Sequence, residues 1–242
     1  MSVRHRIVQG IGANGFGQGV TLLTQLVSVP IFVAAWGMDL YGEWLIVSAI
    51  PTYLALSDIG LTATAGNLMA ILSEKRDVKQ MLSVYQSTWA MVSILSITLL
   101  ALLLTFIWFI DTSQLLGLTR ITGTMLNSTL LLLFCYVALS LQTGILQLPF
   151  RVTKENPLSV TIVNSIRFLE WSVATIVVVA GWTVVAVACA FVLTRAIGNI
   201  YLFWILRNRQ KLPLRLGIQH VDLHALKTLF RPSIASMCFP IG

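Results

Sequence analysis

Charged side chains are scarce in this sequence of 242 residues. Lys, Arg, Asp and Glu together make up 10% of it, whereas soluble domains carry about 25%. Hydrophobic residues make up 57%, and the mean hydropathy is +0.85. This composition excludes an ordinary soluble domain. The formal net charge of +7 does not indicate nucleic acid either, because the basic residues lie between hydrophobic runs instead of forming a patch interleaved with aromatics.

Cysteine is also scarce, and its pattern argues against covalent or metal cross-links. The three cysteines, Cys135, Cys189 and Cys238, are widely spaced and lie within or at the start of apolar segments. A disulfide framework or a zinc site needs a different spacing. Gly10, Gly12 and Gly15 spell a dinucleotide-binding fingerprint, but no strand precedes them and no βαβ unit surrounds them. We therefore predict no metal and no cofactor.

Long apolar stretches fill most of the chain. Six of them cover residues 7–35, 44–72, 89–110, 125–148, 158–180 and 183–206. At a rise of about 1.5 Å per residue, each crosses the ~30 Å hydrocarbon core of a bilayer. A further apolar run begins at Ile234 and has nine residues when the sequence stops at Gly242, so we expect a seventh span to be cut off. The fold class is predicted as all-α: a polytopic membrane bundle with a six-helix lobe over 1–206. A cytoplasmic basic linker covers 207–233 and forms either a short interfacial helix or an ordinary basic loop, and the truncated seventh span covers 234–242.

The basic residues predict the orientation of this bundle. If the N-terminus is cytoplasmic, 13 of the 16 Lys and Arg residues fall in cytoplasmic segments, as the positive-inside rule requires. The links on the opposite side are short, so none of them has room for a soluble catalytic domain. We therefore predict that the chain is not an enzyme. Most tryptophans flank the spans, which is typical of interfacial anchors.

The first span carries a polar stripe on one helix face. Its members are spaced by four or three residues: Asn14, Gln18, Thr21, Gln25 and Ser28. Amides that face lipid would leave hydrogen-bonding groups unpaired, so this face must meet protein or water. One interpretation is a water-filled cavity lined by Asn14, Gln18 and Gln25. The other is contact between helices, helped by Gly15 and Gly19.

Four ionisable side chains lie inside the predicted spans: Asp58, Arg167, Glu170 and Arg195. A charge at mid-membrane costs at least ~2.5–3.5 kcal/mol, so each needs a partner, a cavity or a ligand. Arg167 and Glu170 are three residues apart and share a helix face, where they can pair. One interpretation is a buried structural network of net charge zero. In the other, Arg167 and Arg195 bind an anionic group such as phosphate, while Asp58 and Glu170 balance charge or couple to an ion.

Four segments of the N-terminal region form a recognisable series: Gly15-Phe16-Gly17-Gln18, Pro30-Ile31-Phe32, a Trp36-Gly37-x-x-x-Tyr41-Gly42-x-Trp44 turn and Ser57-Asp58-Ile59-Gly60-Leu61. They are similar to the start of polysaccharide-biosynthesis flippases, the O-antigen and exopolysaccharide exporters of the multidrug/oligosaccharidyl-lipid/polysaccharide (MOP) superfamily. The resemblance covers the first lobe and the opening of span seven. It implies a fold of twelve to fourteen helices in two six-helix lobes around a central cavity.

The resemblance also implies a function. Such a protein moves an undecaprenyl-diphosphate-linked oligosaccharide across the bacterial inner membrane. Its expected partners are that lipid-linked oligosaccharide, membrane lipids, and the polysaccharide polymerase and export machinery. Two alternatives stay open: a drug or small-molecule exporter of the same superfamily, and a membrane-embedded glycan polymerase or glycosyltransferase.

Overall fold

The computed structural model is built of helices joined by short turns. It describes residues 3–56, 59–110, 112–209, 217 and 219–221. Their helices are α1 (Val3–Leu56), α2 (Ile59–Glu74), α3 (Val78–Phe109), α4 (Thr112–Leu115), α5 (Gly123–Val152), α6 (Asn156–Val179) and α7 (Val184–Arg209). Five of these, α1, α3, α5, α6 and α7, are long and apolar enough to cross a membrane. The prediction of an all-α membrane bundle is confirmed. The predicted seventh span, and the predicted linker beyond Arg209 apart from residues 217 and 219–221, lie outside the described residues.

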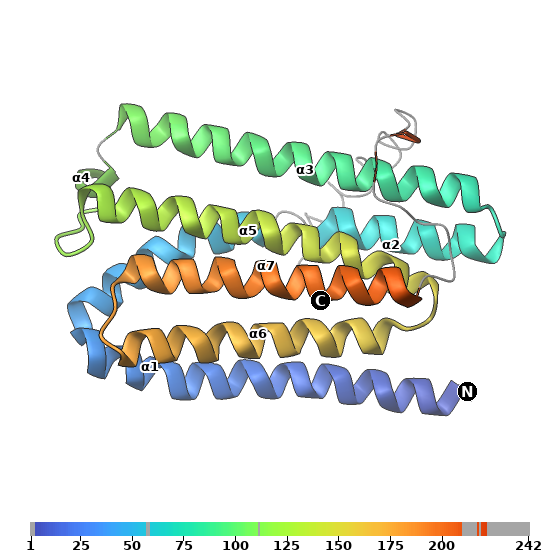
Figure 1. The fold of residues 1–242 in the computed structure, drawn as a ribbon, viewed down its shortest axis with the longest axis horizontal. Coiled ribbons are helices and arrows are strands. Elements are labelled where there is room, and N and C mark those ends of the chain that lie inside the picture. The colour runs from blue at the N-terminus through green and yellow to red at the C-terminus, as the bar shows by residue number, and fades with distance from the viewer. Residues whose placement is uncertain (1–2, 57–58, 111, 210–216, 218, 222–242) are drawn as a thin grey trace.

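The first two predicted spans meet within α1, which bends sharply at Gly37. Gly37 has φ 76° and ψ 167°, a backbone conformation that residues with a Cβ rarely adopt. The first arm of α1 runs along the bundle from the N-terminus, and the chain turns back beyond the bend (Figure 1). The sequence placed a link between two spans over 36–43. In the structure this segment is helical before and after Gly37. The predicted second span, 44–72, is shared between the end of α1 and α2.

Basic side chains gather at one end of the bundle. They belong to the α2–α3 turn, the α5–α6 turn and the last turn of α7: Lys75, Arg76, Arg151, Lys154, Arg207 and Arg209. Figure 1 places these three segments and the N-terminus at the same end. The bend at Gly37, helix α4 and the α6–α7 turn lie at the other end. The charge asymmetry of the sequence is thus an asymmetry of the folded molecule.

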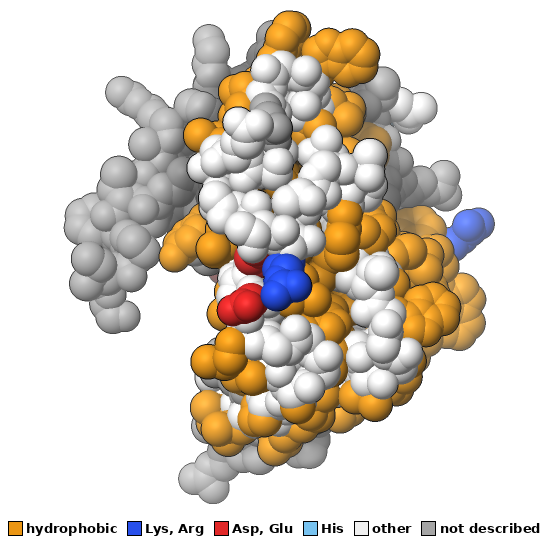
Figure 2. Space-filling model, turned by 90° about the vertical axis from the view of Figure 1, so that its left-hand side faces the viewer, with side chains coloured by type: hydrophobic (Ala, Val, Ile, Leu, Met, Phe, Trp, Pro, Cys, Tyr) orange, Lys and Arg blue, Asp and Glu red, His pale blue; other side chains and the backbone are white. Residues whose placement is uncertain are grey.

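A carboxylate fastens the other end of the bundle. Glu43 of α1 accepts hydrogen bonds from the backbone N–H groups of Thr119, Arg120 and Ile121, at 2.7–3.0 Å. Beside it, Arg120 forms an exposed ion pair of 3.7 Å with Asp39. Figure 2 looks onto this end, where acidic and basic side chains lie together among hydrophobic and uncharged groups. The α4–α5 segment is tied to α1 in this way.

The helices around the later spans approach one another closely. Helix α6 packs against α1 and α7, and α7 packs against α5. A Cβ at Gly198 of α7 would lie 2.7 Å from Cγ2 of Ile166 on α6, and one at Gly17 of α1 would lie 2.5 Å from Nδ2 of Asn164. Small residues at such crossings let membrane helices approach closely. These contacts bring the polar positions of α5, α6 and α7 together.

Candidate functional site

A cavity of about 450 Å³ lies between α1, α5, α6 and α7. Helix α1 contributes its second arm, which follows the bend at Gly37. The lining residues are Trp44, Ser48, Pro51, Leu133, Tyr136, Val137, Ser140, Thr143, Gly144, Gln147, Val163, Arg167, Trp171, Phe191 and Arg195. A cavity of this size, apolar with a few polar groups, is typical of a small-molecule site. It holds both of the arginines that the sequence places in the spans.

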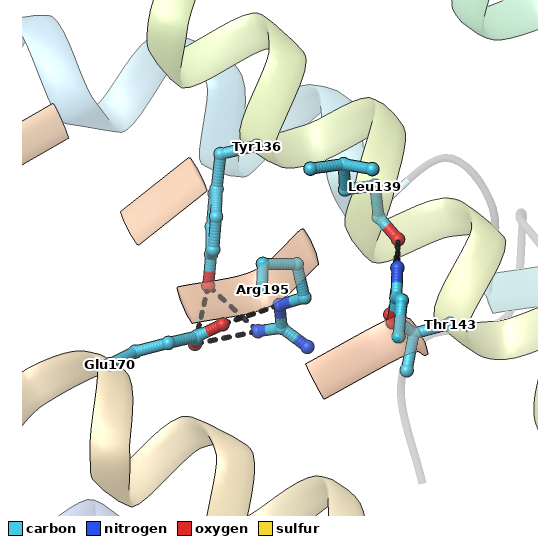
Figure 3. Close-up of polar contacts among 6 residues, drawn as sticks. Tyr136, Leu139, Thr143, Glu170 and Arg195 are labelled. Atoms are coloured by element: carbon cyan, nitrogen blue, oxygen red, sulfur yellow. Dashed lines mark hydrogen bonds and ion pairs between the residues drawn. The ribbon is translucent and has the colours of Figure 1, made fainter. Parts of the chain in front are cut away.

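Arg195 of α7 is held by an acid and a phenol deep in the lobe. Its Nε lies 2.6 Å from Oε1 of Glu170 on α6, and its Nη2 donates to Oε2 at 2.8 Å. Tyr136 of α5 donates its hydroxyl to the same Oε2 at 3.1 Å and accepts from Nη2 at 2.9 Å. Figure 3 shows the three side chains converging from three helices. Glu170 is 0% exposed and Arg195 is 5% exposed. The two charges neutralise each other within a bidentate pair.

A second polar cluster lies one turn further along α7 (Figure 3). Asn199 donates to the backbone carbonyl of Leu139 at 2.8 Å and accepts from the hydroxyl of Thr143 at 2.7 Å. Both the nitrogen and the oxygen of the Asn199 amide are therefore bonded to residues of α5. This cluster fixes the separation of α5 and α7 next to the cavity.

Arg167 differs from Arg195 in its surroundings. It lines the cavity from α6 and is exposed. Among the described residues, no hydrogen bond or ion pair reaches its guanidinium. Glu170, three residues away, pairs with Arg195 instead, and the charge of Arg167 acts on it only from beyond ion-pair distance. The pairing of Arg167 with Glu170 that the spacing allowed is therefore not formed.

Four aromatic side chains form one wall of the cavity. Trp44 of α1 stacks on Phe191 of α7 with 6.4 Å between ring centroids. Tyr136 and Trp171 flank the same ring at 5.5 Å and 5.3 Å. Trp44 is only 3% exposed and packs inside the lobe. The bend at Gly37 turns it into the lobe.

The polar stripe of the first span lies apart from this cavity. Asn14 and Gln18 are exposed on the first arm of α1, and neither lines the cavity. Thr21 and Ser28 donate their hydroxyls to the backbone carbonyls of Gly17 and Thr24. Two further predicted site residues, Asp58 and the side chain of Gln25, lie outside the described residues.

The sequence analysis missed Tyr136 as a partner of the charged pair. A signal was present, because Tyr136 lies in the middle of the predicted fourth span, far from the interface where tyrosine is enriched. A buried tyrosine hydroxyl usually has a hydrogen-bond partner. No group of three or more His, Cys, Asp or Glu side chains comes together within the part of the chain that the structure describes.

The arrangement of helices can be compared with solved structures. No protein-family model and no curated protein sequence matches the chain. A solved structure does match, with a TM-score of 0.65 over 96% of this chain; its title is "Outward-facing conformation of a multidrug resistance MATE family transporter of the MOP superfamily". The fold resembles half of a MOP-superfamily transporter. The match has 16% sequence identity and covers 52% of that transporter's chain. In this chain the cavity lies among the helical segments that follow the bend at Gly37.

Proposed function

We propose that the protein flips a lipid-linked oligosaccharide across the bacterial inner membrane. The substrate is an undecaprenyl-diphosphate-linked repeat unit of O-antigen or exopolysaccharide, and the partners are the surrounding lipids and the polymerase and export machinery that receive it. The resemblance of the fold to half of a MOP-superfamily transporter supports membrane transport. The choice of substrate rests on the charge of the cavity and on the sequence resemblance to the flippases.

The charge of the cavity is the observation that carries this choice. Glu170 and Arg195 cancel in their bidentate pair, which leaves the exposed guanidinium of Arg167 as a net positive charge on the wall. A guanidinium matches the geometry of phosphate oxygens and remains charged at every physiological pH. Such a cavity suits an anionic amphiphile. It is poorly suited to an organic cation, because the carboxylate of Glu170 is already occupied.

A drug exporter of the same superfamily is the second candidate. Two observations favour it: the matched structure is titled a multidrug resistance transporter, and Trp44, Trp171 and Phe191 give the cavity an aromatic wall. In this alternative the aromatic rings bind a flat apolar molecule. The cavity charge then limits the substrates to neutral or anionic compounds.

The distribution of basic side chains supports a cytoplasmic N-terminus. The turn after α2, the turn after α5 and the end of α7 lie at one end of the bundle with the N-terminus (Figure 1). Basic segments of this kind remain on the cytoplasmic side. The end that carries Glu43 and Arg120 then faces outward.

Deletion of the gene in its source cell tests the substrate. We expect lipid-linked oligosaccharide to accumulate in the inner leaflet and surface polysaccharide to disappear. Expression of the natural protein should return both levels to those of the wild type. A panel of fluorescent efflux substrates should leave the deletion strain at the wild-type rate. Normal surface polysaccharide together with slowed efflux of an apolar dye would overturn the flippase proposal in favour of the drug exporter.

A further inference from the structure

The cavity has two tiers that repeat on all four helices that line it. The aromatic tier consists of Trp44, Tyr136, Trp171 and Phe191, and the polar tier consists of Ser48, Ser140, Arg167 and Arg195. On each helix the polar residue is four positions from the aromatic one, on the side toward the basic end of the bundle. Four residues rise by about 6 Å along a helix and return to the same face. The tiers are therefore parallel layers about one turn apart.

The aromatic tier offers more than apolar surface. Its rings contact one another around Phe191, at centroid distances of 5.3–6.4 Å. Neither indole N–H, of Trp44 or of Trp171, has a hydrogen-bond partner among the described residues. Tyrosine and tryptophan combine an apolar ring with a polar atom. A ring-shaped ligand with an apolar face and a hydroxylated edge fits such a surface.

The polar tier contains two groups that need a partner. The Oγ of Ser140 is buried and has no hydrogen-bond partner among the described residues, and a buried hydroxyl left unpaired is costly. The guanidinium of Arg167 lies on the same cavity wall, without an ion pair to any described residue. Arg195 is engaged by Glu170 and Tyr136. An anion bound to Arg167 would lie in the polar tier, the same layer that contains the Ser140 hydroxyl.

We propose that the two tiers form a glycosyl-phosphate site. The phosphate lies in the polar tier, where Arg167 and Ser140 donate to its oxygens, and the first sugar ring packs against Trp171 and Phe191 in the aromatic tier. Sugar and phosphate are bonded directly, so they occupy adjacent layers. This site rests on the proposed function and deepens it, because it assigns recognition to the junction of sugar and phosphate. The isoprenoid tail gains little here, since lipid is as apolar as any protein wall.

Binding of two defined lipids tests the assignment. The natural protein is purified into lipid nanodiscs and titrated with undecaprenyl diphosphate, and separately with undecaprenyl diphosphate that carries one N-acetylglucosamine. We expect the sugar to tighten binding about tenfold, the equivalent of ~1.4 kcal/mol. Arg167→Gln should weaken both lipids by about tenfold or more. Trp171→Leu should abolish the gain from the sugar and leave the affinity for undecaprenyl diphosphate unchanged.

Matched variants separate recognition from loss of fold. Trp171 contacts Phe32 and Phe191, so Trp171→Phe keeps a ring in place and should retain most of the gain from the sugar. Trp204→Leu and Arg209→Gln alter an exposed tryptophan and an arginine that do not line the cavity, and both should bind like the wild type. The assignment is overturned if Trp171→Leu weakens both lipids equally, or if the wild-type protein binds neither lipid. A different result is that deletion of the gene abolishes glycan export while Trp171→Leu changes the affinities for the two lipids equally. That result would support the flippase function and overturn the two-tier site.

Discussion

Removal of Arg195 should destabilise the lobe far more than removal of Arg167. Arg195 and Glu170 are 5% and 0% exposed, and their carboxylate and guanidinium make two contacts of 2.6 Å and 2.8 Å. Arg195→Met leaves the carboxylate of Glu170 buried with only the Tyr136 hydroxyl as a partner. Loss of one member of a buried pair costs about 3–5 kcal/mol in soluble proteins. Arg167→Met removes an exposed charge that pairs with no described residue, and it should change stability by less than about 0.5 kcal/mol.

The double variant Arg195→Met/Glu170→Leu is the matched control for this prediction. Replacement of both charges by apolar side chains of similar size is often neutral or stabilising, so the double variant should regain part of the lost stability. The Tyr136 hydroxyl would then be unpaired at a cost of about 1–3 kcal/mol, which adding Tyr136→Phe should remove. Thermal unfolding of the purified protein in detergent, followed by size-exclusion fluorescence, provides the measurement. If Arg195→Met alone unfolds at the wild-type temperature, the pair does not hold α6 and α7 together and the reasoning fails.

Three further predictions concern other parts of the bundle. Gly198→Ala should lower stability by about 1–3 kcal/mol, because its Cβ would overlap a side chain of α6; Gly19→Ala, which meets nothing within 4 Å, should not, and thermal unfolding compares the two. Glu43→Gln should loosen the segment before α5 by about 1.5–3 kcal/mol because charged hydrogen bonds are lost, which would appear as faster limited proteolysis between α4 and α5. A cysteine at Gln18 should react with a water-soluble maleimide in cells while one at Leu23 should not, since lipid covers Leu23; equal protection would favour helix contact for the polar stripe.

The fold could be predicted from composition and length alone. Apolar stretches long enough to span a bilayer have few alternatives to a helix, because backbone groups in lipid must be paired within the segment. The bend in α1 could not be predicted, because the sequence does not show that Gly37 has a positive φ or that helix continues on both sides of it. The direction in which Trp44 points follows from that bend. The sequence therefore did not show that Trp44 lies in the cavity wall.

The sequence singled out the charged side chains around the cavity but not their pairing, and Asn14 and Gln18, which it also proposed for the site, do not line the cavity. A charge within a span needs compensation, so Arg167, Glu170 and Arg195 stood out in the sequence. The partner of Glu170 depends on the packing of α6 against α7, which the close approach at Gly198 sets. The spacing of three residues within α6 favoured Arg167, but the neighbouring helix supplies Arg195 at 2.6 Å. Local spacing gives the candidates, and the tertiary contacts select among them.

Export of glycan by Arg167 variants tests the central claim most directly. The natural protein is expressed with Arg167→Gln, Arg167→Lys or Arg209→Gln in the deletion strain, and surface polysaccharide is measured relative to protein abundance. We expect Arg167→Gln to abolish export at normal abundance and Arg167→Lys to restore it only in part, because lysine keeps the charge without the bidentate geometry. Arg209→Gln should export normally. Normal surface polysaccharide from Arg167→Gln would contradict the proposal that this cavity carries an anionic, lipid-linked substrate.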